Sequence, residues 1–237
     1  MRLDQYLVSH HQVESRNKAS EYIKEGSVYV NNSVVRKPSF DVQESDVVDI
    51  QKMSEYVSRG GLKLRGFLQD VQSLSVENLE CLDIGSSTGG FVQVLIEEGA
   101  MSVTAVDVGT NQLHNSLRLN PKVFLYEQTD IRAFCPSKQY DIVTCDVSFI
   151  GIAQILQDID RLAKKDIILL FKPQFEVGKD VKRTTKGVVK DMVAIKRAQD
   201  KFVSQAVTMG WSLVAQKESV VKGKEGNAET FYYFEKR

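Results

Sequence analysis

The sequence predicts an α/β chain in which a mostly parallel sheet, covered by helices on both faces, follows a small α+β module. Three observations support this prediction. Beyond about residue 80, strand-like apolar runs alternate with amphipathic helical segments, as in parallel sheets whose connections are helices. The first of these strands ends in a glycine-rich turn that leads into a helix. The first fifty residues instead combine two short helical patterns with short β segments.

The N-terminal module is expected to span residues 1–52. Apolar residues with helical spacing begin at Leu3, and Ser15 is a suitable N-cap for a second helix that Gly26 ends. Short strands are expected to follow at 28–30, 34–35 and 47–50. Two helices with a few short strands make a module close to the lower size limit for independent folding.

A second domain is expected over residues 62–237, after a linker over 53–61 whose paired glycines, Gly60 and Gly61, suit a turn or hinge. Its strands are expected at 81–84, 103–108, 123–126, 142–147, 167–171, 211–215 and 231–234. Its helices are expected at 91–96, 113–119, 152–162 and 192–209. The last two strands fit a closing antiparallel pair.

Composition is that of a soluble globular protein. Of 237 residues, 42% are hydrophobic and 26% are charged, and the formal net charge is zero, so an RNA-binding surface must be a local patch. The N-terminus has no apolar signal-peptide core, and the longest apolar run, 167–171, is too short to cross a bilayer. Cys81, Cys135 and Cys145 have no metal-ligand spacing. We expect a cytoplasmic protein with no metal site and no stable membrane association.

A candidate ligand site lies where the first three strands of the second domain end. The glycine-rich turn lets the backbone approach a ligand, but it matches neither G-x-G-x-x-G nor a P-loop. Asp107 suits a ribose diol and Asp130 an adenine amino group; a solvated carboxylate and a helix N-cap are the respective alternatives. The expected cofactor-binding residues are Asp83, Gly85, Ser86, Ser87, Thr88, Gly89, Gly90, Phe91, Asp107 and Asp130.

Longer motifs resemble those of a known enzyme family. The loop DIGSSTGGF at 83–91 resembles the cofactor loop of FtsJ-like Rossmann methyltransferases. A narrower resemblance, to the TlyA family, rests on SRGGLKL at 58–64, CDVSFI at 145–150, FKPQFEVG at 171–178 and GNAE at 226–229. The N-terminal segments RLDQYL at 2–7 and SRNKA at 15–19 resemble the ribosomal-protein S-four type RNA-binding domain, or αL motif.

This resemblance covers essentially the whole chain. It implies a Rossmann-like class I methyltransferase fold with a seven-stranded, mostly parallel sheet. It also implies S-adenosylmethionine (S-adenosyl-L-methionine) as the cofactor and 2′-O-methylation of cytidine in ribosomal RNA as the reaction, with ribosomal RNA or a ribosomal subunit as the partner. The chain begins at the αL motif and ends just after its last strand. It therefore resembles the short form of the family, which is implied to modify large-subunit RNA only.

The family's catalytic Lys-Asp-Lys-Glu tetrad matches this sequence at Lys63, Asp146, Lys172 and Glu229. Methyl transfer to a ribose hydroxyl needs in-line alignment and removal of the hydroxyl proton, which a lysine accepts only when it is neutral. We assign Lys172 as this base and Lys63 as a second cation. We expect Asp146 to orient Lys172 and to line the methyl end of the cofactor site, and Glu229 to orient Lys63 or the ribose. Taken singly, Lys63, Lys172 and Glu229 each have an ordinary interpretation as a solvated surface residue.

Candidate RNA contacts lie in two regions. Residues 1–60 hold eight Lys and Arg against nine acids, so RNA binding there requires that basic residues gather on one face of the module. Residues 172–201 hold nine Lys and Arg against four acids, an excess of five positive charges beside the proposed active site. A solvated mixed-charge surface and a flexible polar loop are the alternative interpretations. The expected RNA-binding residues are Arg2, Arg16, Lys18, Arg36, Lys37, Lys182, Arg183 and Lys186.

Two other functions compete with the methyltransferase. Some family members were named haemolysins, but the absent signal peptide, the absent transmembrane run and the zero net charge argue against direct membrane lysis. A non-catalytic ribosome-binding factor on a methyltransferase fold is the second alternative, and the intact cofactor and tetrad positions argue against it. The sequence identifies neither the target nucleotide nor the oligomeric state.

Overall fold

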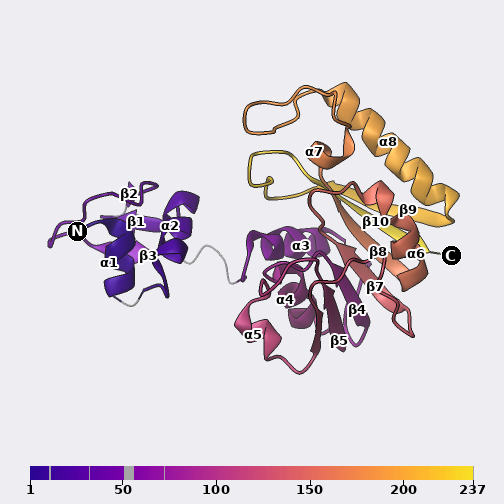
Figure 1. Cartoon of the computed structure of the whole chain (residues 1–237), viewed down its shortest axis with the longest axis horizontal. Helices are drawn as coiled ribbons and strands as arrows, with labels where there is room; N and C mark the ends of the chain where they lie inside the picture. The colour runs from indigo at the N-terminus through magenta and orange to yellow at the C-terminus, as the bar shows by residue number, and fades with distance from the viewer. Residues whose placement is uncertain (11, 32, 51–55, 72, 237) are drawn as a thin grey trace. The chain divides into compact units, whose positions relative to one another are not determined.

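The computed structural model describes residues 1–236 except 11, 32, 51–55 and 72 (Figure 1). The chain divides into two compact units, Met1–Glu55 and Tyr56–Arg237. Residues 53–55 of the expected linker lie outside the described residues, and the domain boundaries expected from sequence remain predictions.

The first unit packs two helices on a small antiparallel sheet. Its elements are α1 (Leu3–Ser9), α2 (Arg16–Glu25), β1 (Val28–Val30), β2 (Ser33–Val34) and β3 (Val48–Ile50). The strand order is β2-β1-β3. The predicted caps of α2 are confirmed, because the Ser15 side chain accepts a hydrogen bond from Lys18 N and Gly26 ends the helix with φ of 85°. Leu3, Leu7 and Ile23 are fully buried in the core of this unit.

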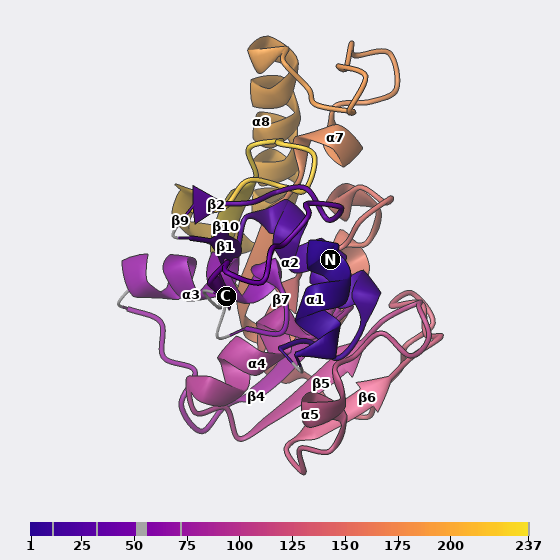
Figure 2. The same cartoon turned by 90° about the vertical axis from the view of Figure 1, so that its left-hand side faces the viewer.

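The second unit is built on a seven-stranded sheet, as predicted. Its strands are β4 (Glu80–Ile84), β5 (Ser102–Val106), β6 (Val123–Tyr126), β7 (Tyr140–Cys145), β8 (Ala163–Phe171), β9 (Trp211–Glu218) and β10 (Thr230–Lys236). Their order is β6-β5-β4-β7-β8-β10-β9, and Figure 2 shows β6 and β9 at opposite sides of the sheet. The strands from β4 to β8 are parallel, whereas β10 runs antiparallel to both β8 and β9.

Helices cover both faces of this sheet. They are α3 (Arg59–Asp70), α4 (Gly90–Glu97), α5 (Asn115–Arg118), the 3₁₀ turn η1 (Ile152–Gln154), α6 (Leu156–Leu162), α7 (Pro173–Glu176) and α8 (Met192–Thr208). The prediction of a single helix over 152–162 is wrong at one position. The structure has η1 and α6 there, separated at Ile155, whose φ of −123° departs from helical geometry.

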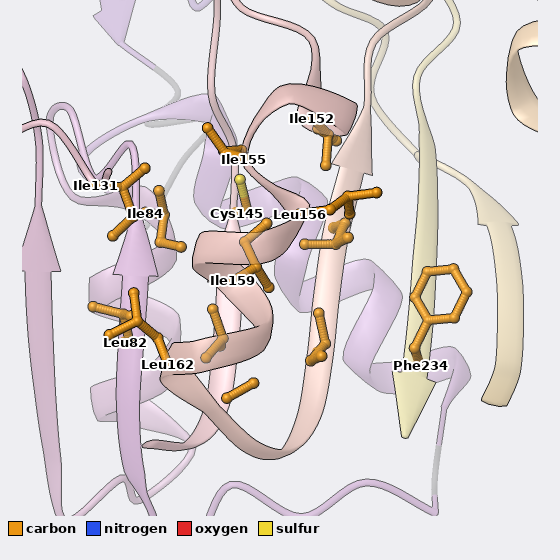
Figure 3. Close-up of a cluster of buried hydrophobic side chains, with 14 of the residues drawn as sticks. Leu82, Ile84, Ile131, Cys145, Ile152, Ile155, Leu156, Ile159, Leu162 and Phe234 are labelled. Atoms are coloured by element: carbon orange, nitrogen blue, oxygen red, sulfur yellow. The ribbon is translucent and has the colours of Figure 1, made fainter. Parts of the chain in front are cut away.

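Alternation along the strands produces two hydrophobic layers. In β8, Ile167, Leu169 and Phe171 face one side with α6 and α8, while Ile168 and Leu170 face the other with α3 and α4. Figure 3 shows the α6 side of the sheet, where the apolar side chains of α6 lie over those of β4 and β7. Because both faces are buried, the central strands read as continuous apolar runs in the sequence.

The turn predicted at Gly60 and Gly61 is wrong, because both glycines lie in the first turn of α3. Close packing requires glycine at position 61, where a Cβ would lie 2.5 Å from the Tyr56 side chain, but not at position 60. A Cβ on Gly90, the first residue of α4, would lie 2.6 Å from the backbone nitrogen of Gly61 and would also meet the Ser58 hydroxyl. The absence of side chains lets the starts of α3 and α4 touch, and this contact places α3 beside the glycine-rich loop.

We predict that Gly90→Ala lowers the free energy of unfolding by about 1–3 kcal/mol, the usual cost of forcing a methyl group into a packed contact. Gly60→Ala is the matched control, since its Cβ would meet nothing closer than 3.3 Å. An alanine in a helix is favoured over glycine, so Gly60→Ala should be neutral or more stable by about 0.5–1 kcal/mol. Urea unfolding measures both, and equal effects of the two substitutions would refute the packing argument.

Candidate active site

The candidate active site lies at the carboxyl ends of the central strands. The strand order reverses at β4, which has β5 on one side and β7 on the other, so a crevice opens at this edge. Gly85 follows β4 with φ of 80°, and a Cβ there would lie 3.0 Å from the carbonyl oxygen of Asp146. Glycine satisfies both the left-handed conformation and the close approach. The loops after β4 and β7 therefore meet inside the crevice.

A cavity of about 430 Å³ occupies this crevice. Small-molecule sites are usually about 300–1,000 Å³, so the cavity is large enough for a cofactor. The predicted cofactor-binding residues that line it are Gly85, Ser87, Asp107, Asp130 and Asp146. Lining residues that the sequence analysis missed include Val108, Gln112, Thr129, Arg132, Ser148 and Phe149. Ser148 and Phe149 lie in the CDVSFI motif, so extending the site along that motif would have found them.

Asp107 joins the loop after β4 to the end of β5. Its Oδ2 accepts a hydrogen bond from Ser87 N at 2.8 Å, and its Oδ1 accepts one from Gly109 N at 2.7 Å. A carboxylate offers about four lone-pair sites, so two remain for a ligand in the cavity. Asp107 is thus both a structural tie for the glycine-rich loop and a candidate acceptor for a diol.

Asp130 is held by a neighbouring arginine. Arg132 Nε donates to both carboxylate oxygens, at 2.9 and 3.1 Å, and Arg132 N donates to Oδ1 at 2.9 Å. These hydrogen bonds from Arg132 hold the pKa of Asp130 at about 2, so the carboxylate is charged at neutral pH. An amino group that binds Asp130 must share it with Arg132.

Asp83 and Ser86 place unpaired polar atoms beside the glycine-rich loop. Asp83 is fully buried at the end of β4, where its Oδ1 accepts a 2.7 Å hydrogen bond from the Thr144 hydroxyl. Asp83 Oδ2 and Ser86 Oγ are also buried and have no hydrogen-bond partner among the described residues. Burial raises the pKa of Asp83 to about 7, while the Thr144 hydrogen bond opposes this rise. Buried groups without partners are rare, so these two atoms indicate a ligand or water at this loop.

The other predicted loop residues shape the loop and do not line the cavity. Gly89 caps α4 with φ of 96°, and a Cβ there would collide with the Leu117 side chain. The carbonyl of Thr88 accepts a hydrogen bond from His114 N at 3.2 Å. Phe91 lies in the core with its ring 6.0 Å from that of Phe231, so its side chain points away from the proposed cofactor site.

The four predicted tetrad residues form two ion pairs. Lys172 directly follows β8, and its Nζ lies 2.6 Å from Asp146 Oδ1 and donates to Ser148 Oγ at 2.9 Å. Lys63, on the inner side of α3, donates to Glu229 Oε2 at 2.6 Å. Lys63, Lys172 and Glu229 are each less than a tenth exposed. Buried charges of this kind persist only when they are paired.

The two ion pairs lie at the same end of neighbouring strands. Thr230 in β10 is the partner of Phe171 in β8. Because the strands are antiparallel, the next residues outward are Glu229 and Lys172. Lys63 joins this group through its hydrogen bond to Glu229. The strand register therefore gathers all four residues at the edge of the sheet where the cavity lies.

In the first unit, one buried carboxylate joins two of the predicted RNA-binding arginines. Asp4 accepts hydrogen bonds from Arg2 Nε and Nη2 and from Arg16 Nη2, each at 3.0 Å. Hydrogen bonding from Arg2 is the main reason that the pKa of Asp4 falls to about 2, with a smaller effect of Arg16. Both arginine side chains are about half exposed. Asp4 thus fixes two guanidinium groups side by side at the surface.

The other predicted RNA contacts of this unit are not brought to Asp4. Lys18 donates to Glu21 at 3.0 Å, and Arg36 donates to the carbonyl of Lys24 at 3.1 Å. Lys37 is exposed. A single face that gathers all five basic residues is therefore not evident from their contacts.

The segment between α7 and α8 is organised by Arg183. Its guanidinium donates to four backbone carbonyls, those of Gln174, Gly178, Lys179 and Val181. This arginine holds the segment together, so its four Nη hydrogens are already used and a role in RNA contact would need some of them to be released. Lys182 and Lys186 are exposed on the same segment and keep their predicted role as proposals.

Comparison with known proteins identifies a family for each of the two units. Residues 56–236 match the model of the FtsJ-like methyltransferase family, and residues 1–48 match that of the S4 domain. A protein of Campylobacter jejuni named 23S rRNA (cytidine-2′-O)-methyltransferase TlyA is 47% identical, over 99% of this chain and 99% of its own length. A protein of Mycobacterium tuberculosis named 16S/23S rRNA (cytidine-2′-O)-methyltransferase TlyA is 38% identical, over 98% and 88%.

A solved structure from Streptococcus thermophilus with a hemolysin description is also similar. It has a TM-score of 0.77 and 33% sequence identity, and the match covers 100% of this chain and 88% of that one. The chain therefore belongs to the FtsJ-like methyltransferases and, within them, to the TlyA family. Among the helices of the described residues, none has the length and apolar character needed to span a membrane.

We predict that Asp83 makes the cofactor-free protein less stable as pH rises. The pKa of Asp83 is raised in the folded state, so the native protein retains a proton that the unfolded chain releases. The free energy of unfolding should therefore fall as pH rises from about 4 to about 7 and stay lowered above that.

Asp83→Asn cannot titrate and should flatten this part of the curve. Urea unfolding at a series of pH values measures the difference between the two proteins. Curves that stay parallel from pH 4 to pH 7 would show that Asp83 titrates normally.

Proposed function

We propose that this chain is an S-adenosylmethionine-dependent enzyme that methylates the ribose 2′-oxygen of a cytidine in ribosomal RNA, with large-subunit RNA as its substrate. The observation that carries this proposal is the convergence of two buried lysine–carboxylate pairs beside a cavity at the strand ends. The name of the Campylobacter jejuni relative, which this chain matches over its full length, supports the choice of RNA.

The cavity suits S-adenosylmethionine. Asp107 and Asp130 would hold the adenosine end, through the ribose diol and the adenine amino group. The loop after β4, where Asp83 Oδ2 and Ser86 Oγ lack partners, would hold the methionine end. When bound, the cofactor supplies a sulfonium methyl group that a nucleophile can attack. The residues of the chain must then bring the ribose oxygen into line and take its proton.

Lys172 is placed to take this proton. A neutral amine has two N–H donors and one lone pair. Nζ donates one hydrogen to Ser148 Oγ and lies in ion-pair contact with Asp146 Oδ1, so these two groups orient the amine and leave its lone pair to face the 2′-hydroxyl. The geometry thus supports Lys172 as the base and Asp146 as the residue that orients it.

Lys63 and Glu229 suit the orientation of the RNA. An ammonium group has three donors, and Glu229 takes one of those of Lys63. The remaining donors are available for the ribose or an adjacent phosphate. Beyond the site, the S4 unit with Arg2 and Arg16, together with Lys182 and Lys186, would bind the RNA backbone.

We predict that Asp107→Ala weakens S-adenosylmethionine binding by about 1–3 kcal/mol, because hydroxyl groups of the ribose would lose a buried acceptor. Isothermal titration calorimetry measures the affinity, with thermal unfolding as the check that the variant is folded. Glu127→Ala is a useful control, since Glu127 lies nearby but outside the cavity lining. Unchanged affinity in a folded Asp107→Ala protein would remove Asp107 from the cofactor site.

We predict that Lys172→Ala lowers the single-turnover methylation rate by about 10²–10⁴-fold, the range for loss of a positioned general base. Lys172→Arg should fail as well, because arginine stays charged and accepts no proton. Affinity for the cofactor and RNA should change much less, since the lost interaction matters mainly in the transition state.

The assay is transfer of a labelled methyl group to ribosomal RNA, followed by mass-spectrometric mapping of the modified ribose. Substantial activity of Lys172→Arg would reject the base in favour of a simple positive clamp. Methylation at a base atom would reject the ribose as the acceptor.

A further inference from the structure

The loop after β7 is joined to the segment after β8 by three contacts in sequence. At the first, Lys172 Nζ donates to Ser148 Oγ at 2.9 Å. At the second, the rings of Phe175 and Phe149 lie 5.6 Å apart. The third, farthest along the chain from Lys172 and Ser148, is a 2.7 Å hydrogen bond from Ile152 N to Glu176 Oε1. The first contact involves the proposed base, so the geometry of this loop bears on that lysine.

Glu176 is an acidic residue that the proposed mechanism does not use. No ion pair within the described part of the chain includes it. Its other oxygen, Oε2, lies over Gly151, where a Cβ would be 3.0 Å away. Burial raises the pKa of Glu176 to about 7, and the hydrogen bond from Ile152 N opposes this rise. A partly buried carboxyl whose contacts are with one backbone segment is suited to holding that segment.

The loop that Glu176 contacts is strained. Phe149 has φ of 69°, in the left-handed region that bulky side chains avoid, and its side chain is 93% exposed. A conformation of this kind persists only where the surroundings impose it. The Lys172–Ser148 contact precedes Phe149 and the Glu176–Ile152 contact follows it, so the strained residue is fixed on both sides.

We propose that Glu176 is a positioning residue for Lys172: by holding the Ile152 amide it keeps the loop in the conformation that presents the Ser148 hydroxyl to the lysine amine. The inference rests on the proposed role of Lys172 as the base. Without the Glu176 contact the loop relaxes at Phe149, the Ser148 hydroxyl moves away, and the amine loses one of the two groups that orient its lone pair. The competing account is that Glu176 merely fixes the end of α7.

The test compares Glu176→Ala with Glu176→Gln in the full-length protein. Glutamine keeps an oxygen that accepts from Ile152 N, whereas alanine does not. Amide hydrogen–deuterium exchange, without cofactor or RNA, should become about tenfold faster at residues 148–152 in Glu176→Ala and stay slow in Glu176→Gln. Asp180→Ala, an exposed acid on the following segment, is the control and should leave exchange at 148–152 unchanged.

Single-turnover methylation gives the second readout. Glu176→Ala should lower the rate roughly 10- to 100-fold with little change in cofactor affinity, and Glu176→Gln should restore it. Gly151→Ala disturbs the same contact from the loop side and should also speed exchange at 148–152 and lower the methylation rate. This second variant tests the proposal if Glu176→Ala does not fold. Unchanged exchange, or a Glu176→Gln protein as slow as Glu176→Ala, would overturn the proposal.

These outcomes are separable from failure of the proposed function. A wild-type protein that methylates no ribose would overturn the function, and the exchange comparison would still decide whether Glu176 holds the loop. Normal methylation by Glu176→Ala with faster loop exchange would overturn the positioning role alone.

Discussion

The pairing of two buried lysines with two carboxylates is the constraint on which the site depends. A lysine is rarely buried, and an unpaired buried ammonium would cost several kcal/mol. Lys63 and Lys172 are nevertheless less than a tenth exposed, each against its own acid. Removing either acid leaves a buried charge without its counter-ion. The first pair joins α3 to the residue before β10, and the second joins the ends of β7 and β8.

The directions of the strands in the sheet place the paired residues at the same edge. Parallel strands end at a common edge, and β10 enters in the opposite direction, so a residue that precedes β10 meets a residue that follows β8. The close approach at Gly85 brings the loops after β4 and β7 together at the same edge. One edge of one sheet therefore carries both the cavity and the lysine that we propose as the proton acceptor.

Sequence reasoning located the strands because the periodicity of apolar residues is a local signal. Acids that follow the strands pointed to the cavity, whereas the tetrad positions came from the resemblance to the TlyA family, and the roles of these residues stay predictions. Asp107 and Asp130 line the cavity as expected, and the tetrad assembles. It failed where tertiary contacts decide. Gly60 and Gly61 suggest a turn but lie in the first turn of α3, where Gly90 of α4 packs closely against the Gly61 nitrogen. The four hydrogen bonds from Arg183 to backbone carbonyls also leave no sequence signal, and the RNA contact expected of Arg183 stays a prediction. The link from Glu176 to Ile152 joins residues 24 positions apart and leaves no local pattern.

The hydrogen bond between Lys63 and Glu229 spans 166 positions of the chain, from the first helix of the second unit to the residue before its last strand. β10, which follows Glu229, is inserted between β8 and β9 and so completes the sheet last in chain order. Contacts of such large sequence separation form late because a long loop must close first. During synthesis on the ribosome, a nascent chain can already contain every residue that lines the cavity and still lack Glu229, the last member of the tetrad. With the tetrad acting as proposed, such an incomplete chain would not methylate RNA.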